Sequence, residues 1–102
     1  MVRNALRMCP DWVRKRIRVV AIAPAAYIDD YLCHSVVHYV SDGDIVHRID
    51  AEGRERCKHT TRVLERHKDA RGLVDHAFLS PTFQPAIYHE THSYLKKAHT
   101  WL

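Results

Sequence analysis

The sequence predicts a small α/β fold in which a three-stranded parallel sheet is flanked by helices. Three observations lead to this prediction: an uninterrupted apolar run at residues 19–23, two β-branched stretches at 35–40 and 60–64, and helical periodicity at both ends of the chain. Helical or irregular connections separate the three stretches. Parallel neighbours need such crossovers, so this order is typical of an α/β sheet.

Length and composition indicate one folded domain over residues 1–102. Of the 102 residues, 46% are hydrophobic and 27% are charged, a balance typical of globular proteins. The formal net charge is +4, and six of the 16 lysines and arginines lie in the first eighteen residues. Such crowding attracts anions or an anionic membrane surface, although a solvated helix face is the simpler interpretation.

Several classes of function lack a signal in the sequence. No stretch reaches the roughly 18–20 apolar residues that span a bilayer. No aromatic interleaving or glycine-rich phosphate loop supports nucleic-acid binding. No targeting segment is visible, so the cellular location is left open.

The chain opens with an amphipathic helical pattern over residues 2–17, with the arginines gathered opposite the apolar side chains. Pro10 cannot donate a backbone hydrogen bond and should kink or restart the helix. No capping residue precedes Val2, so we expect the chain to begin inside an element of a larger fold.

The predicted strands follow in order. Residues 19–23, VVAIA, end at Pro24 and predict a strand buried on both faces of a parallel sheet. Residues 25–34 should form a connection or a short helix. The β-branched residues at 35–40 and 60–64 predict the second and third strands.

From Pro81 onward, helical spacing predicts a last helix whose apolar stripe packs against the sheet. The stripe consists of Phe83, Ile87, Tyr94, Ala98 and Leu102. The opposite side of this helix carries His89, His92 and His99, for which we expect a solvated face.

The cysteines and histidines predict no disulfide, metal site or cofactor. Cys9, Cys33 and Cys57 are odd in number and lack CxxC spacing, so a reducing compartment is the default. His34 and His38 share one face of an extended strand, and Cys57-x-His59 is expected nearby. No spacing among these residues matches a four-ligand zinc site.

Two residues with catalytic chemistry follow predicted strands. Asp44 follows the second strand in SDGDIV, and His76 follows the third in DHAFLSP. Because loops beyond the carboxyl ends of parallel strands converge, we expect them to meet although 32 positions separate them. A carboxylate there would fix the histidine tautomer and let the ring act as a general base.

Each of these residues also has a simpler interpretation. Asp42 and Gly43 form an Asp-Gly pair, a strong local signal for a hairpin between residues 35–40 and 45–49. Asp75 or His76 could merely cap the helix that follows.

The order of strand, acid loop, strand, histidine and C-terminal helix resembles the C-terminal half of an α/β-hydrolase. AIAPAAYI is similar to the strand and proline-containing loop that follow the nucleophile helix in lipase-like members. The stretches VAIAPAAYI, HYVSDGDIVHRID and DHAFLSPTF closely resemble an uncharacterised family of chlamydial proteins of unknown function. The hydrolase resemblance implies that Asp44 is the acid, His76 the histidine, and the helix from Val2 the one that leaves the nucleophile.

The sequence departs from the hydrolase pattern at the nucleophile. It contains no GxSxG, the only glycines being Gly43, Gly53 and Gly72. The serines are interpreted as strand-start, turn, helix-cap and helix-face residues, namely Ser35, Ser41, Ser80 and Ser93. We therefore expect a C-terminal hydrolase-like segment without its nucleophile half, which is inactive alone because Asp44 and His76 have nothing to activate.

Two expectations about partners follow. Without the rest of a hydrolase sheet, residues 19–23 would expose an apolar edge that could recruit a second copy or the missing N-terminal half. The alternative function is a small basic α+β binding or self-association module, in which Arg3, Arg7 and Arg14 meet an anionic partner and residues 35–49 form a hairpin.

Overall fold

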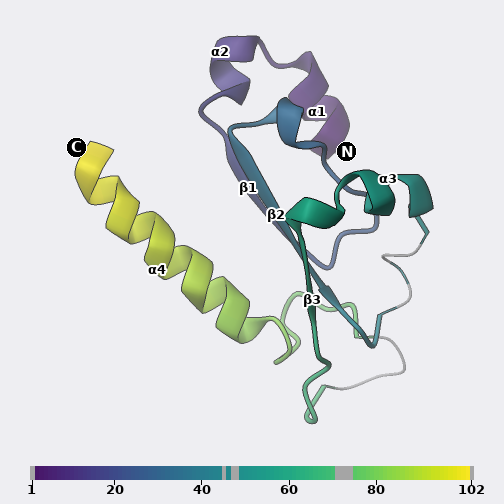
Figure 1. Ribbon diagram of the computed structural model, residues 1–102. Coiled ribbons are helices and arrows are strands. Elements are labelled where there is room, and N and C mark those ends of the chain that lie inside the picture. Colours follow the sequence, from purple (N-terminus) through teal and green to yellow (C-terminus); the bar gives the residue numbers. More distant parts are fainter. Residues whose placement is uncertain (1, 45, 47–48, 71–74, 102) are drawn as a thin grey trace.

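The computed structural model describes residues 2–44, 46, 49–70 and 75–101. Its centre is a parallel sheet of β1 (Arg18–Ile22), β2 (Ser35–Ser41) and β3 (Thr61–Leu64), in the order β1-β2-β3 (Figure 1). The predicted three-stranded parallel sheet flanked by helices is confirmed, and each strand lies within one residue of its predicted position. All three strands therefore point their carboxyl ends toward the same rim.

The alternative interpretation of residues 35–49 as a hairpin is wrong. β2 pairs in parallel with β1 on one side and with β3 on the other, so both of its edges are occupied. Val40, near the end of β2, is fully buried. Packing on two parallel neighbours thus overrides the local turn tendency of Asp42 and Gly43, and the chain leaves the sheet after Ser41.

The N-terminal helix is interrupted at Pro10, as predicted. α1 (Val2–Met8) and α2 (Asp11–Arg14) lie on either side of this proline, and α2 ends three residues before the predicted end. Leu6 of α1 is buried in a cluster that includes Leu32 and Val36. The apolar side of α1 thus covers one face of the sheet.

Short helices complete this side of the molecule. η1 (Asp30–Leu32) lies in the first crossover, and α3 (Ala51–Arg56) and η3 (Lys58–Thr60) lie in the second. Asp50 caps α3 by accepting a hydrogen bond from the backbone N–H of Gly53, at 3.1 Å. Its other oxygen accepts the N–H of Tyr27 at 3.2 Å, which joins the two crossovers.

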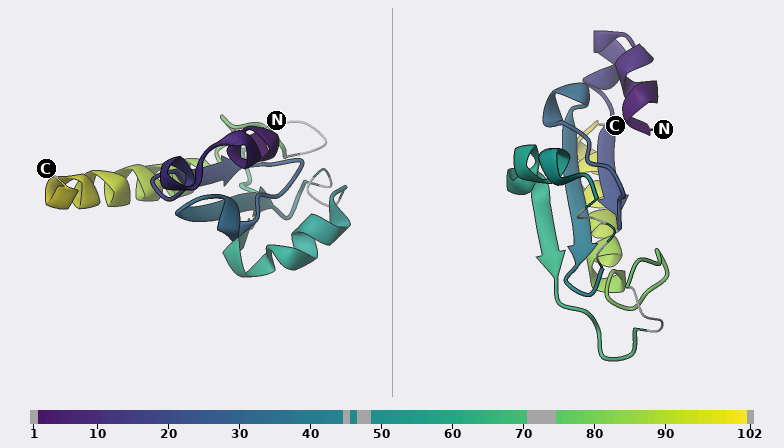
Figure 2. Two further views of the ribbon diagram at one scale, coloured as in Figure 1. Left: turned by 90° about the horizontal axis from the view of Figure 1, so that it is seen from above. Right: turned by 90° about the vertical axis from the view of Figure 1, so that its right-hand side faces the viewer.

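α4 (Gln84–Trp101) lies on the opposite face of the sheet from α1 and α3 (Figure 2). It begins three residues after Pro81. Phe83 is fully buried and packs with Tyr39 and Ala86. Within the described residues, none of the helices has the length and apolar character that crossing a membrane requires.

Two predictions of burial are wrong on this face. Tyr94 is 53% exposed, so the described part of the apolar stripe packs on the sheet in the first turns of α4 and not at Tyr94. The side chains of Ala98, His99 and Leu102 lie outside the described part of the chain. Val20 of β1 is 43% exposed, so β1 is not buried on both faces. Both differences arise because α4 diverges from the sheet toward its C-terminal end (Figure 1).

Candidate functional site

The structure brings Asp44 and His76 together at the carboxyl rim of the sheet. Nδ1 of His76 lies 2.5 Å from Oδ2 of Asp44. Asp44 follows the central strand β2, and His76 belongs to the connection between β3 and α4. The catalytic role of the two residues stays a prediction.

Asp44 is fully buried, and its carboxylate is held from two sides. Oδ1 accepts the backbone N–H of Val46 at 2.8 Å, and Oδ2 meets His76. The backbone N–H of Asp44 donates to the carbonyl of Ser41 at 3.1 Å, which turns the chain sharply after β2. This tight turn aims the carboxylate inward rather than into water.

The ring of His76 is partly open to solvent, its side chain being 36% exposed. An ionised carboxylate only accepts hydrogen bonds, so Nδ1 carries the proton in the contact with Asp44. In the neutral ring the lone pair then lies on Nε2, which bonds to no described residue. A general base with this geometry would take a proton on Nε2, with the carboxylate stabilising the resulting imidazolium.

Beside this pair lies a polar cluster that the sequence interpretation missed. Asp75 is 1% exposed, and its carboxylate accepts hydrogen bonds from three hydroxyl groups. The donors are Ser41 Oγ at 2.6 Å, Ser80 Oγ at 2.5 Å and Thr82 Oγ1 at 2.5 Å. Burial opposes ionisation of Asp75, but these hydrogen bonds outweigh it and hold the pKa of Asp75 below its usual value.

The cluster corrects two predictions about helix caps. Ser80 donates to Asp75 instead of capping α4, which begins only at Gln84. Neither Asp75 nor His76 caps α4, since both precede it by several residues. The available signal was an acid preceded by two apolar residues and followed by Ser80 and Thr82 on either side of Pro81.

Of the histidines considered as metal ligands, His38 is a buried structural residue. His38 is fully buried: its Nε2 accepts the N–H of Ile28 at 2.9 Å, and its Nδ1 lies 3.2 Å from Thr60 Oγ1. Desolvation by burial lowers the pKa of His38, so the ring is neutral. His34 is exposed, and among the described residues no three His, Cys, Asp or Glu side chains gather where a metal ion could be held.

The cysteines are unpaired. Cys57 is buried beside Asp29, with Sγ 3.7 Å from its Oδ1. Burial, followed by the charge of Asp29, raises the pKa of the Cys57 thiol to about 11. This thiol is therefore protonated at neutral pH and is a poor nucleophile.

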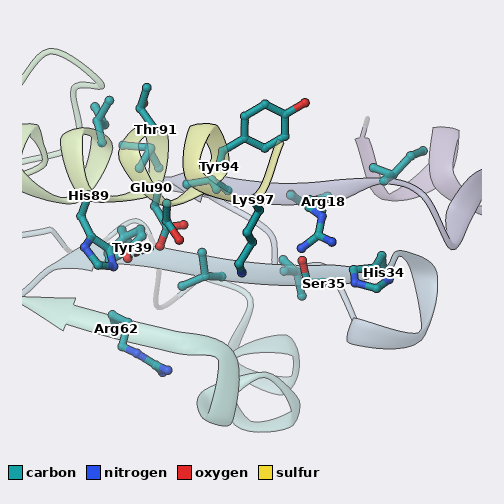
Figure 3. Close-up of a pocket in the computed structure, with 18 of the residues that line it drawn as sticks. Arg18, His34, Ser35, Tyr39, Arg62, His89, Glu90, Thr91, Tyr94 and Lys97 are labelled. Carbon is teal, nitrogen blue, oxygen red and sulfur yellow. Dashed lines mark hydrogen bonds between the residues drawn. The ribbon is translucent and has the colours of Figure 1, made fainter. Parts of the chain in front are cut away.

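A large open groove lies between the sheet and α4 (Figure 3), with a volume of about 1390 Å³. Neither Asp44 nor His76 lines it. Glu90 of α4 accepts a hydrogen bond from the hydroxyl of Tyr39 on β2 at 2.6 Å. Burial and then this bond raise the pKa of Tyr39 to about 12.

The groove has an apolar floor and a cationic lining. Val20 and Val37 lie among its strand residues. Its cations are Lys15, Arg16, Arg18, Arg62 and Lys97, against the single carboxylate of Glu90. In Figure 3, Lys97 points from α4 toward the sheet and Arg18 lies on the strand beside it.

Comparison with known proteins gives one match. A family model described as "Protein of unknown function (DUF687)" matches residues 1–95. Searches of curated proteins and of solved structures find no match to this chain.

Proposed function

Since the chain belongs to the DUF687 family, whose description states no activity, we propose a function from its residues: it is the C-terminal segment of a serine α/β-hydrolase-like protein. In this proposal it carries the acid, Asp44, and the histidine, His76, but no nucleophile. It is inactive as a free chain. The observation that carries the proposal is the 2.5 Å contact between Asp44 Oδ2 and His76 Nδ1 at the rim of parallel strands.

The arrangement of the pair supports this proposal. In a Ser-His-Asp relay, the carboxylate accepts from one ring nitrogen and holds the tautomer, while the other nitrogen takes the proton of the serine hydroxyl. Asp44 occupies the first of these positions. Nε2 of His76 faces no described partner and would be the atom that takes the proton.

Three hydroxyl groups and one thiol of the chain are held in ways that support the absence of a nucleophile. The hydroxyls of Ser41, Ser80 and Thr82 all donate to Asp75 and not to His76. Cys57 is buried with a raised pKa. The parent chemistry would be ester or acyl hydrolysis, and the resemblance to chlamydial proteins stays part of the same proposal.

An ester assay tests the inactivity of the free chain. We expect the chain to hydrolyse p-nitrophenyl acetate no faster than its His76→Ala variant, and a fluorophosphonate probe to leave it unlabelled. His92→Ala, which removes an exposed histidine, is the matched control. Turnover that is lost in His76→Ala and retained in His92→Ala would contradict the proposal.

The coding DNA upstream of Met1 tests the other part of the proposal, that the chain is the C-terminal segment of a hydrolase-like protein. An in-frame GxSxG motif, preceded by alternating strand and helix patterns, is expected from a hydrolase-like parent. An upstream region with no open frame would count against the proposal.

A second candidate function is the binding of an anionic partner, and the cationic groove favours it. Five cations against one carboxylate give this groove an excess of positive charge. Its volume of about 1390 Å³ exceeds the roughly 300–1,000 Å³ of small-molecule sites, so a peptide segment fits better than a metabolite. The hairpin is not part of this candidate, because β2 has two parallel neighbours.

Two triple variants that remove the same charge distinguish binding in this groove from binding by the arginines of α1 and α2. Binding of poly-L-glutamate should weaken as salt rises, because exposed charges are screened. The triple variant Lys15→Gln, Arg16→Gln and Arg62→Gln should abolish binding. The control triple, Arg3→Gln, Arg7→Gln and Arg14→Gln, should retain it. Equal losses in both triples would show that net charge alone attracts the ligand.

A further inference from the structure

We propose that Asp75 is a positioning residue that holds His76 on Asp44. The inference takes the Asp44–His76 pair of the proposed function as its starting point and goes beyond it by assigning a role to the neighbouring carboxylate. Asp75 touches neither the ring of His76 nor the carboxylate of Asp44 through any hydrogen bond. It acts through the two loops that carry them.

The backbone of Asp75 joins the histidine loop to the acid loop. Its N–H donates to the carbonyl of Gly43 at 3.2 Å. Gly43 directly precedes Asp44, and Asp75 directly precedes His76. One backbone hydrogen bond therefore links the residues immediately before the two members of the pair.

The side chain of Asp75 also holds Gly43, through the hydroxyl of Ser41. Ser41 Oγ accepts the N–H of Gly43 at 3.1 Å and donates its own proton to Asp75 Oδ2 at 2.6 Å. Gly43 is thus held through both its N–H and its carbonyl. A Cβ at Gly43 would approach Cδ of Arg66 to 2.6 Å, so the turn is also closely packed from outside.

The two remaining hydroxyls fix the loop after His76. Ser80 Oγ accepts the N–H of Thr82 at 3.3 Å and donates to Asp75 Oδ1. Thr82 Oγ1 accepts the N–H of His67 at 2.9 Å and donates to Asp75 Oδ2. Each hydroxyl therefore accepts a backbone N–H and directs its proton at Asp75.

This pattern requires an acceptor with no proton of its own. An ionised carboxylate accepts on both oxygens, whereas a carboxamide presents two N–H donors on one side. In Asp75→Asn, at least one hydroxyl would face a donor instead of an acceptor. The loop from residue 75 to 82 should then shift, and the ring of His76 should leave Asp44.

The tautomer of His76 reports its position directly, without any activity. When neutral, a ring held by Asp44 carries its proton on Nδ1, whereas a free histidine side chain in water prefers the proton on Nε2. The tautomers are distinguished by ¹⁵N NMR of the histidine side chains at about pH 8, above the usual histidine pKa of about 6.5. The signals of His76 are assigned by their loss in His76→Gln.

His38 provides an internal control for the fold. Its Nε2 accepts the N–H of Ile28, so its neutral ring also carries the proton on Nδ1. In Asp75→Asn we expect His76 to change to the Nε2–H tautomer as its major form while His38 retains Nδ1–H. Asp69→Asn, at a side chain that is 71% exposed, should change neither ring.

Thr82→Val is the second variant, because it removes one hydroxyl at nearly constant shape and leaves the charge of Asp75. We expect a partial change of the His76 tautomer in this variant, again with His38 unchanged. Retention of Nδ1–H on His76 in both variants would overturn the proposal. A change of both His76 and His38 away from Nδ1–H would also overturn it, because it would indicate a merely structural role. An Nε2–H tautomer in the unmodified chain would overturn the Asp44–His76 pair itself, whereas a negative ester assay leaves the positioning role standing.

Discussion

Nδ1 of His76 lies 2.5 Å from Oδ2 of Asp44, which joins a fully buried carboxylate to a ring that is partly exposed. The other oxygen of Asp44 accepts the N–H of Val46. Each of the two oxygens of Asp44 therefore accepts one hydrogen bond at this turn.

Replacing Asp44 by alanine should lower the free energy of unfolding by about 1–3 kcal/mol, because it leaves the partly buried N–H of Val46 and Nδ1–H of His76 without their acceptor. Asp44→Asn retains one amide oxygen and should cost less. Urea denaturation measures both values. Asp69→Ala, at an exposed position, should stay within about 0.5 kcal/mol of the unmodified chain. Equal losses for alanine and asparagine would contradict the assigned hydrogen bonds.

The buried ring of His38 should make stability depend on pH. Its pKa is lowered in the folded protein, so below about pH 6.5 the unfolded chain binds a proton that the folded chain does not. The contribution of His38 is fully present above this pH and is lost as the pH falls through 6.5 toward the folded pKa. Urea midpoints at about pH 7.5 and 5.5 measure the change.

His38→Gln should reduce this loss between the two pH values, because the amide oxygen can accept the N–H of Ile28 without titrating. The variant is expected to be less stable at the higher pH, since it also loses the ring contact with Tyr27, whose centroid is 5.0 Å away. His92→Gln, at an exposed site, should retain the pH dependence of the unmodified chain. An undiminished loss in His38→Gln would contradict a neutral buried ring.

The hydrogen bond from Tyr39 to Glu90 should hold the first half of α4 on the sheet. Tyr39→Phe removes the hydroxyl that donates to Glu90. Backbone amides at residues 86–93 should then exchange their hydrogens with solvent faster. Amides of β2 should keep their protection. Hydrogen exchange followed by NMR makes this comparison, and unchanged exchange in α4 would show that Phe83 and Ala86 suffice to hold the helix.

The same tyrosine predicts an alkaline loss of stability. The pKa of Tyr39 is raised to about 12 in the folded chain, whereas an unfolded tyrosine titrates near 10. Its contribution is thus present below about pH 10 and is lost as the pH rises toward 12. Tyr39→Phe should weaken this loss, while Tyr88→Phe, at a side chain that is 70% exposed, should not.

Gly53→Ala should destabilise α3. A Cβ at this position would overlap the carboxylate of Asp50, which caps the helix and also accepts the N–H of Tyr27. Displacing this carboxylate costs about 0.5–2 kcal/mol, the usual value of an N-cap. Thermal or urea unfolding measures the cost. Glu52→Ala, at an exposed neighbour in α3, should have little effect, and a stabilised Gly53→Ala variant would contradict the close contact.

The sequence by itself determined the type and order of the three strands and of the helices at the two ends of the chain. β-branched runs predict strands, helical spacing predicts the terminal helices, and Pro10 interrupts the first helix because it lacks an N–H. Parallel order follows from the crossovers. Parallel order in turn predicts that the loops bearing Asp44 and His76 share a rim, because all carboxyl ends of such a sheet point the same way.

Only the tertiary structure decided which partners the polar side chains find. The Asp-Gly signal after β2 is local, whereas pairing of β2 with strands on both sides depends on segments far along the chain. In the same way, Asp75 meets Ser41 across 34 positions, and His38 meets the N–H of Ile28 across ten. Spacing within a segment encodes periodicity and steric preference, but a buried hydrogen bond requires that two separate loops close on each other, and that closure is a property of the folded chain.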